Sequence, residues 1–269
     1  MMLIVIKAGG DLLVNGFPLS LAAEIKTLCS THRFVMVHGG GDIVTDISTK
    51  LGHPPRFVMS PRGFKSRYTD RQTVEIYTMV MAGKINKQII STLQKAGINA
   101  LGLSGLDGAA VKAKRKEQII SLNDQGKKIL MDGGYTGQIE AVNDKLLRLL
   151  IDNGYMPVIS AVAMGAQAEP LNVDGDRMAA NVASALKADL LILFTDVDGV
   201  MREGTLVEKL NLCEAKELQD KIGPGMSTKV YAAQEALKGG VTEVIIISGL
   251  KEGALVSSLS HSGGTVIIQ

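Results

Sequence analysis

The stretch Leu3-Ile4-Val5-Ile6-Lys7-Ala8-Gly9-Gly10 decides the fold class. It opens with an unbroken apolar run, which is typical of a strand covered on both faces rather than of a strand with one face in water. Similar apolar runs recur at residues 34–37, 156–159, 190–194 and 243–247, and segments of helical periodicity separate them at 21–29, 73–95 and 178–186. This alternation predicts an α/β fold of three layers (α/β/α), in which helices cover both faces of a mostly parallel central sheet.

The middle of the chain interrupts this alternation. Residues 111–137 are polar and rich in lysine, and they contain Gly126 and Gly133-Gly134, which indicates a β-hairpin. A turn-rich stretch at 165–170 separates two α/β parts. We therefore predict one lobe of residues 1–165 and a second lobe of residues 166–269.

The composition excludes several classes of protein. The chain has 269 residues, of which 46% are hydrophobic, and a formal net charge of +2, so it is not a disordered chain. No apolar run approaches the roughly 20 residues of a membrane-spanning helix, and no cleavable signal pattern follows the start, so we expect a cytoplasmic protein without membrane contacts. The pI near 8.4 comes without a basic block or aromatic platform, which argues against nucleic-acid binding and favours an acidic small molecule or partner. Cys29 and Cys213 match no metal or redox spacing, and we expect both to be at least half-buried.

Two glycine-rich turns follow the first two apolar runs. Lys7-Ala8-Gly9-Gly10 comes after the first run, and His38-Gly39-Gly40-Gly41-Asp42 comes after the second. Glycines at the carboxyl end of a parallel strand let backbone N–H groups approach an anion, and a lysine adds a point charge. Three consecutive glycines cost backbone entropy, which favours a nest of N–H groups for a phosphoryl oxygen. For the first turn, a solvated lysine in a tight turn is the alternative, and we expect His38 to be structural rather than a general base.

Three further strings are candidate parts of the same site. Asn172-Val173-Asp174-Gly175-Asp176 precedes a helix expected to begin near Met178, with Asp174 or Asp176 as its cap. The string is not a calcium loop, because Ala185 stands where such a loop requires glutamate. Residues 194–200 and 223–230 are expected to form loops of the kind that surround a nucleotide. Lys229 at a helix start is electrostatically costly unless an anion lies opposite, although a surface lysine is the alternative.

Taken in order, these strings resemble the amino acid kinase family, and the resemblance extends from Lys7 to residues 263–266. The family includes acetylglutamate, aspartate, glutamate 5-, carbamate and uridylate kinases. The resemblance implies an ATP-dependent phosphotransferase that uses MgATP and, in the acetylglutamate kinase-like members, a carboxyl group as acceptor. It also implies that residues 1–165 bind the acceptor and form a homodimer, whereas residues 166–269 bind ATP.

The resemblance also assigns roles to individual residues. Lys7 and Lys229 would be catalytic lysines that bind the transferring phosphoryl group, and Asp176 would hold both in position. Backbone N–H groups of Gly9, Gly10, Gly40 and Gly41 would bind the phosphoryl oxygens, and Gly40 and Gly41 would also contact the acceptor, whose α-carboxylate end Arg67 and Asn172 would hold. The nucleotide-binding residues would be Asp196, Val197, Asp198, Gly199, Val200, Met201, Lys221, Ile222, Gly223 and Met226. No protein ligand to a metal is expected, because ATP phosphates and water would mainly hold Mg²⁺.

Four strings resemble one branch of the family more closely, namely residues 51–57, 66–70, 102–108 and 134–137. They are similar to kinases of lysine biosynthesis that phosphorylate 2-aminoadipate while a small acidic carrier protein blocks its amino group with a C-terminal glutamate. Dual-function archaeal members also accept carrier-linked glutamate, which serves arginine synthesis. Basic residues expected around the mouth of the acceptor site are Arg56, Arg62, Lys65, Arg67 and Arg71, with a solvated loop as the alternative.

Two other functions remain open at this point. One is a free-standing N-acetylglutamate kinase of arginine biosynthesis, and the other is a non-catalytic nucleotide-binding sensor on the same fold. The combination of Lys7, Lys229 and Asp176 argues against the sensor, because a binder needs no compensation of transition-state charge. For the homodimer, the helix at 73–95 is the expected contact. Its apolar residues are Val74, Tyr77, Val80 and Met81, and their periodicity fits core packing equally well.

Overall fold

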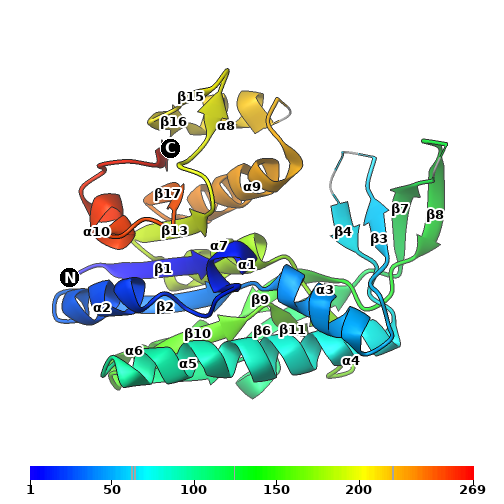
Figure 1. Ribbon diagram of the computed structural model, residues 1–269, viewed down its shortest axis with the longest axis horizontal. Helices are drawn as coiled ribbons and strands as arrows, with labels where there is room; N and C mark the ends of the chain where they lie inside the picture. Colours follow the sequence, from blue (N-terminus) through cyan, green and yellow to red (C-terminus); the bar gives the residue numbers. More distant parts are fainter. Residues whose placement is uncertain (62, 64, 124, 220) are drawn as a thin grey trace.

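The centre of the protein is an eight-stranded sheet with the order β16-β18-β17-β13-β1-β2-β10-β5 (Figure 1). The computed structural model describes residues 1–61, 63, 65–123, 125–219 and 221–269. All neighbouring strands of this sheet are parallel except β17 and β18. Its strands are β1 (Leu3–Ala8), β2 (Arg33–His38), β5 (Ala100–Leu103), β10 (Met156–Ser160), β13 (Leu190–Thr195), β16 (Lys209–Asn211), β17 (Glu243–Ser248) and β18 (Thr265–Ile268). Each of the five predicted strands is present.

Helices cover both faces of this sheet, which confirms the three-layer prediction (Figure 1). One layer contains α6 (Asp144–Asp152), α7 (Gly175–Leu186) and α9 (Pro224–Lys238), and the other contains α2 (Leu19–Leu28), α5 (Asn86–Lys95) and α10 (Ala254–Leu259). The middle strands are fully buried between the layers, as Val5, Val35 and Leu191 illustrate. This double coverage explains why their sequences are unbroken apolar runs.

Other helical segments connect the strands. They are α1 (Gly10–Leu13), α3 (Gly41–Lys50), α8 (Leu212–Gln219) and the 3₁₀ turn η2 (Asp107–Ala109). None of the described helices is long and apolar enough to cross a membrane. Cys29 is half-buried as expected, but Cys213 is exposed on α8, because only one side of this surface helix faces the core.

The helix expected at 73–95 is a continuous run of three segments, α4 (Arg71–Thr78), the π-helical η1 (Met79–Ile85) and α5. Val74, Tyr77, Val80 and Met81 all lie in the buried core of the chain. Their periodicity therefore reports core packing, and these four side chains are not available as contacts between two copies.

A four-stranded antiparallel sheet, which we call the flap, stands away from the body of the protein (Figure 1). It consists of β4 (Lys65–Arg67), β3 (Phe57–Met59), β7 (Gln118–Leu122) and β8 (Lys128–Asp132). The hairpin expected within 111–137 is β7–β8, and its neighbours β6 (Val111–Arg115) and β9 (Gly137–Val142) form a second small sheet with β11 (Val162–Met164) and β12 (Pro170–Asn172). A further short hairpin consists of β14 (Met201–Arg202) and β15 (Thr205–Leu206).

The turn at residues 165–170, where we expect two lobes to meet, lies between β11 and β12. The central sheet extends across this point in the sequence. β1 from the first part pairs with β2 on one side and with β13 from the second part on the other.

Candidate active site

The candidate site lies at the carboxyl end of β1, where the order of the sheet reverses. Because β2 and β13 flank β1, the chain leaves β1 in one direction and later returns on its other side. Ligands of open α/β sheets bind in the crevice that such a reversal creates. A cavity of about 650 Å³ opens there, and its lining includes Lys7 on β1, the turn Gly39-Gly40-Gly41 after β2, and Asp176 on α7.

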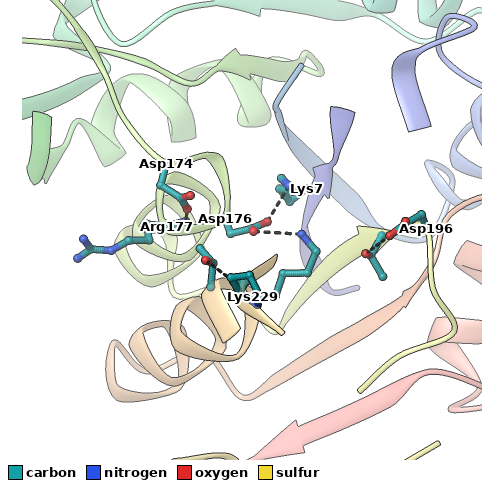
Figure 2. A network of polar contacts seen from close by, with 9 residues as sticks. Lys7, Asp174, Asp176, Arg177, Asp196 and Lys229 are labelled. Atoms are coloured by element: carbon teal, nitrogen blue, oxygen red, sulfur yellow. Dashed lines mark hydrogen bonds and ion pairs between the residues drawn. The ribbon is translucent and has the colours of Figure 1, made fainter. Parts of the chain in front are cut away.

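Two lysines from distant parts of the chain converge on one carboxylate in this cavity (Figure 2). Lys7 Nζ lies 2.8 Å from Asp176 Oδ1, and Lys229 Nζ donates to Asp176 Oδ2 over 3.1 Å. Lys7 and Asp176 are almost completely buried. Asp174 is the cap of α7, because its Oδ1 accepts a hydrogen bond from the Arg177 N–H at 2.9 Å. The helix therefore begins at Gly175 rather than near Met178, and Asp176 in its first turn pairs with the lysines.

The three charges shift one another's pKa. Burial raises the pKa of Asp176, but Lys7 and Lys229 outweigh burial, and the pKa ends below its usual value. Burial lowers the pKa of Lys7, but the charge of Asp176 and the hydrogen bond to it outweigh burial and leave this pKa raised. For Lys229, burial and the charge of Lys7 lower the pKa, and Asp176 offsets them only in part. The cluster therefore consists of an ionised carboxylate between two ammonium groups.

The glycine turns bring bare backbone close to Lys7. A Cβ on Gly10 would lie 3.6 Å from Gly41 N, and a Cβ on Gly175 would lie 3.5 Å from Lys7 Cε, so the two turns and the stem of the lysine are in close contact. Gly40 precedes α3 with φ of +142°, a conformation that side chains disfavour, and a Cβ there would overlap Ile85 Cδ1. The first N–H groups of a helix have no partner within it. No side chain of the described residues caps α1 or α3, so their first N–H groups are available to an anion beside Lys7.

Arg67 and Asn172 lie on other walls of the same cavity. Arg67 Nη2 donates to the Gly41 carbonyl at 2.9 Å and to Thr45 Oγ1 at 2.8 Å, whereas its buried Nη1 has no partner among the described residues. A buried donor without a partner is costly, so Nη1 is suited to an anionic ligand. Asn172 Nδ2 donates to the buried Thr69 Oγ1 at 2.9 Å, which fixes the side chain of Asn172 at the edge of the cavity.

The comparisons with known proteins agree with this geometry. Residues 2–248 match the amino acid kinase family. The chain belongs to the amino acid kinase family. Among curated relatives of this kinase, the putative [LysW]-aminoadipate/[LysW]-glutamate kinase of Nitrosopumilus maritimus is 48% identical over 98% of the chain and 99% of the relative. The [LysW]-aminoadipate/[LysW]-glutamate kinase of Metallosphaera sedula is 44% identical over 97% of the chain and 98% of the relative.

Solved structures resemble this kinase in fold. N-acetylglutamate synthase of Neisseria gonorrhoeae, complexed with coenzyme A and N-acetyl-glutamate, has a TM-score of 0.83 at 26% identity. The match covers all of this kinase and only 59% of the synthase chain. Carbamate kinase of Giardia has a TM-score of 0.71 at 16% identity, with coverage of 100% of this kinase and 99% of the neighbour.

His38 of the kinase is fully buried, in agreement with a structural role. Asn86 Nδ2 lies 3.2 Å from its Nε2, and its Nδ1 lies 2.9 Å from the Gly39 carbonyl. Because the Nδ2 amino group of Asn86 can only donate, His38 accepts at Nε2, carries its proton on Nδ1 and donates from there to the Gly39 carbonyl. Burial lowers the pKa of His38 to about 4, so the ring is neutral at pH 7 and holds the glycine turn in place.

Of the segments expected to bind the nucleotide, residues 221–223 directly precede α9, the helix that carries Lys229. Residues 196–201 connect β13 to β14, and Thr195 Oγ1 donates to Asp196 Oδ1 at 3.0 Å (Figure 2). Asp196, Val197, Asp198 and Met201 are exposed, whereas Gly199 and Val200 are buried. Both backbone groups of Val200 are hydrogen-bonded within the protein, because its N–H donates to Thr265 Oγ1 at 2.8 Å and its carbonyl accepts from the Val207 N–H at 2.9 Å. Lys221 and Gly223, before α9, are exposed, and Ile222 and Met226 are half-buried. The stretch 224–230, expected as a loop, is helical because Pro224 occupies the first position of α9, where its fixed φ suits a helix.

Several groups that line the site carried no signal in the sequence. Tyr77 lines the cavity and its hydroxyl donates to the Ala161 carbonyl at 3.1 Å, although apolar periodicity is all that its sequence context shows. Lys116 at the base of the flap also lines the cavity. Of the basic residues expected at the mouth, Lys65 and Arg67 line the cavity, Arg56 and Arg71 are exposed nearby in sequence, and Arg62 lies outside the described residues. Within the described ranges, no three His, Cys, Asp or Glu side chains are placed to hold a metal ion.

Proposed function

We propose that this amino acid kinase transfers the γ-phosphoryl group of ATP to the side-chain carboxylate of 2-aminoadipate while a carrier protein blocks the amino group. The observation that carries the proposal is the pair Lys7 and Lys229 on one buried carboxylate, beside two free helix N-termini. The substrate follows from the relatives, whose names give [LysW]-aminoadipate and [LysW]-glutamate and which match over nearly their full length. The product is an acyl phosphate in lysine biosynthesis, and use of carrier-linked glutamate would extend the enzyme to arginine biosynthesis.

The chemistry needs no general base. The acceptor carboxylate is ionised at pH 7, so its oxygen attacks the γ-phosphorus directly while the bond to the bridging oxygen of ADP breaks. Catalysis then consists of aligning two anions and stabilising the charge on the phosphoryl oxygens. Lys7 and Lys229 supply positive charge from opposite sides, and Asp176 keeps both ammonium groups at fixed positions. N–H groups of Gly9, Gly10, Gly40 and Gly41 would complete the cradle.

The two carboxylates nearest the lysines are already engaged within the protein, which fits a metal ion that arrives bound to the nucleotide. The carboxylate of Asp176 is already engaged by two lysines, and Asp174 caps α7. We therefore propose that ATP phosphates and water hold Mg²⁺, which when bound supplies further neutralisation of phosphate charge. The residues that we propose for the nucleotide are Asp196, Val197, Asp198, Gly199, Val200, Met201, Lys221, Ile222, Gly223 and Met226.

The proposed acceptor enters between the body and the flap. Arg67, through its unpaired Nη1, and Asn172 would hold the α-carboxylate end of 2-aminoadipate. Arg56 and Lys65 add positive charge to the flap, where Lys65 Nζ lies 4.6 Å from the centre of the Phe57 ring. An acidic carrier protein suits such a surface, because complementary charge speeds association.

The remaining proposals concern assembly and the roles of the two lobes. Residues 1–165 would bind the acceptor and residues 166–269 the nucleotide, with the cluster of Lys7, Asp176 and Lys229 between them. A homodimer in the cytoplasm is also proposed, and the exposed Met79 on η1 is an apolar group that could contact a second copy.

The test is release of ADP from MgATP with four acceptors, namely carrier-linked 2-aminoadipate, carrier-linked glutamate, free 2-aminoadipate and N-acetylglutamate. Hydroxylamine trapping identifies the acyl phosphate. We expect turnover with carrier-linked acceptors alone. Efficient turnover of N-acetylglutamate alone would instead identify an N-acetylglutamate kinase, and nucleotide binding without any turnover would identify a sensor.

A further inference from the structure

Lys116 lines the cavity but has no part in the chemistry described above. It lies between β6 and β7, where the flap joins the body. Its main chain is fixed on two sides: its N–H donates to the Thr136 carbonyl at 2.9 Å, and Gly133 lies so close that a Cβ there would overlap the carbonyl oxygen of Lys116. The position of this lysine is therefore well defined, although its ammonium group serves no visible structural purpose.

The other cations of the cavity already have partners. Lys7 pairs with Asp176, and Arg177 forms two hydrogen bonds with the carboxylate of Glu235 at 2.8 and 2.6 Å. Lys65 lies over the Phe57 ring, and Arg67 uses one of its two terminal nitrogens. Lys116, in contrast, has no hydrogen-bond or ion-pair partner in the described part of the chain.

The surroundings of Lys116 make an unpaired ammonium group costly. The side chain is half-buried, and burial together with the charge of Arg177 lowers its pKa, which Asp174 offsets only in part. A partly desolvated cation without a partner costs free energy unless a ligand supplies the missing anion. Lys116 and the free Nη1 of Arg67 thus form two separate anion sites. The two sites lie against different elements. Arg67 donates to the Gly41 carbonyl of α3, whereas Lys116 is influenced by the charges of Asp174 and Arg177 at the start of α7.

The chemistry of the proposed acceptor identifies what each anion site binds. Of the two carboxylates of 2-aminoadipate, one attacks phosphorus and the other is the α-carboxylate, for which Arg67 is available. A further anionic group must therefore belong to whatever is attached to the amino nitrogen. We propose that Lys116 binds a carboxylate on the group that blocks the amino nitrogen of the acceptor, and that it thereby selects among acceptors by this group. The proposal rests on the proposed function, and it predicts discrimination against N-acetylated acceptors, because an acetyl group carries no charge.

The test compares two ligands that differ only in this charge. N-glutaryl-2-aminoadipate and N-pentanoyl-2-aminoadipate carry acyl groups of equal length, but only the first ends in a carboxylate. Titration calorimetry measures their Kd for the wild-type kinase and for Lys116→Met and Lys116→Arg. We expect the wild type to bind the glutaryl compound about tenfold more tightly, as one partly desolvated ion pair allows. Lys116→Met should abolish this preference, and Lys116→Arg should retain most of it.

Lys114→Met is the matched control. Lys114 is an exposed lysine on the same strand, β6, and it lies outside the cavity, so its loss should leave the preference unchanged. Thermal unfolding shows whether Lys116→Met is folded. A preference that persists in Lys116→Met, or no preference or no binding in the wild type, would overturn the proposal. Failure of the proposed function is distinct, because it appears as absent phosphoryl transfer to carrier-linked acceptors, whereas this titration requires no turnover.

Discussion

At the scale of single residues, the cluster around Asp176 has more positive than negative charge. One carboxylate contacts two ammonium groups, so these three largely buried side chains together carry a net positive charge. Positive charge fixed in advance is what a transferring phosphoryl group requires, because the protein then needs no reorganisation at the moment of reaction. Lys229 is held less tightly by Asp176 than Lys7 is, since its distance to the carboxylate is the longer of the two. Burial also lowers the pKa of Lys229.

Replacement of Lys229 by methionine tests this account. We expect Lys229→Met to lower kcat by about 10² or more, because one donor to developing charge is lost. The fold should persist, since Asp176 keeps its contact with Lys7 and methionine fills a similar volume. Steady-state kinetics with carrier-linked 2-aminoadipate measures kcat, and circular dichroism checks the fold. Near-normal turnover in a folded variant would remove Lys229 from the catalytic site.

At the scale of elements, the turn between β2 and α3 depends on its contact with η1. Gly40 has a positive φ and its Cα faces Ile85 of the π-helical segment, so this contact leaves no space for a side chain. The next residue, Gly41, has nothing within 4 Å of an added Cβ. Packing and backbone conformation therefore require glycine at position 40, but neither requires it at position 41.

This contrast leads to a prediction for paired variants. Gly40→Ala should lower the free energy of unfolding by about 2 kcal/mol, because the backbone conformation is strained for alanine and Ile85 must move. Gly41→Ala should leave the free energy of unfolding within about 0.5 kcal/mol of the wild type. Adding Ile85→Val removes the overlapping Cδ1, so it should restore part of the loss in Gly40→Ala. Urea denaturation measures all four proteins. Equal stabilities of the Gly40 and Gly41 variants would contradict the contact.

The elements also show which features the sequence can predict. Strands buried on both faces are recognisable in the sequence as apolar runs. Lys7 and the glycines stand at or just after the ends of these runs, so this part of the candidate site can be predicted from the sequence. The flap strands β3 and β4 are three residues long and mostly exposed, and β3 pairs with β7 more than fifty residues away, so no local pattern marks them. Lys116 is similarly invisible, because Gly133 and α7, distant in sequence, create its environment.

At the scale of the whole molecule, the proposed lobes share one sheet. β1 lies between β2 and β13, so the two parts of the chain bury each other's strands, and the boundary near residue 165 does not separate two independent sheets. A group buried in the middle of this sheet should therefore report on the unfolding of the whole chain. His38 at the end of β2 is such a group, because it is fully buried and neutral.

His38 makes the stability of the whole chain depend on pH. Because burial lowers its pKa from 6.5 to about 4, the unfolded state binds a proton between these values that the folded state does not. More protons in the unfolded state mean that the free energy of unfolding falls as pH decreases below about 6.5. At pH 5 this group alone should cost about 2 kcal/mol relative to pH 7. Urea denaturation at both values measures the difference.

Two variants separate His38 from the other groups that titrate in this range. His38→Gln removes the titrating ring, so the loss of stability between pH 7 and pH 5 should shrink by about 2 kcal/mol, whatever the substitution costs at pH 7. His261→Gln should keep the full loss, because His261 is exposed and its ring contacts Glu243 at the surface. The comparison is between pH values within each protein, so a destabilised variant remains informative. If His38→Gln loses as much stability at pH 5 as the wild type, the buried ring is not the group that makes the folded sheet sensitive to acid.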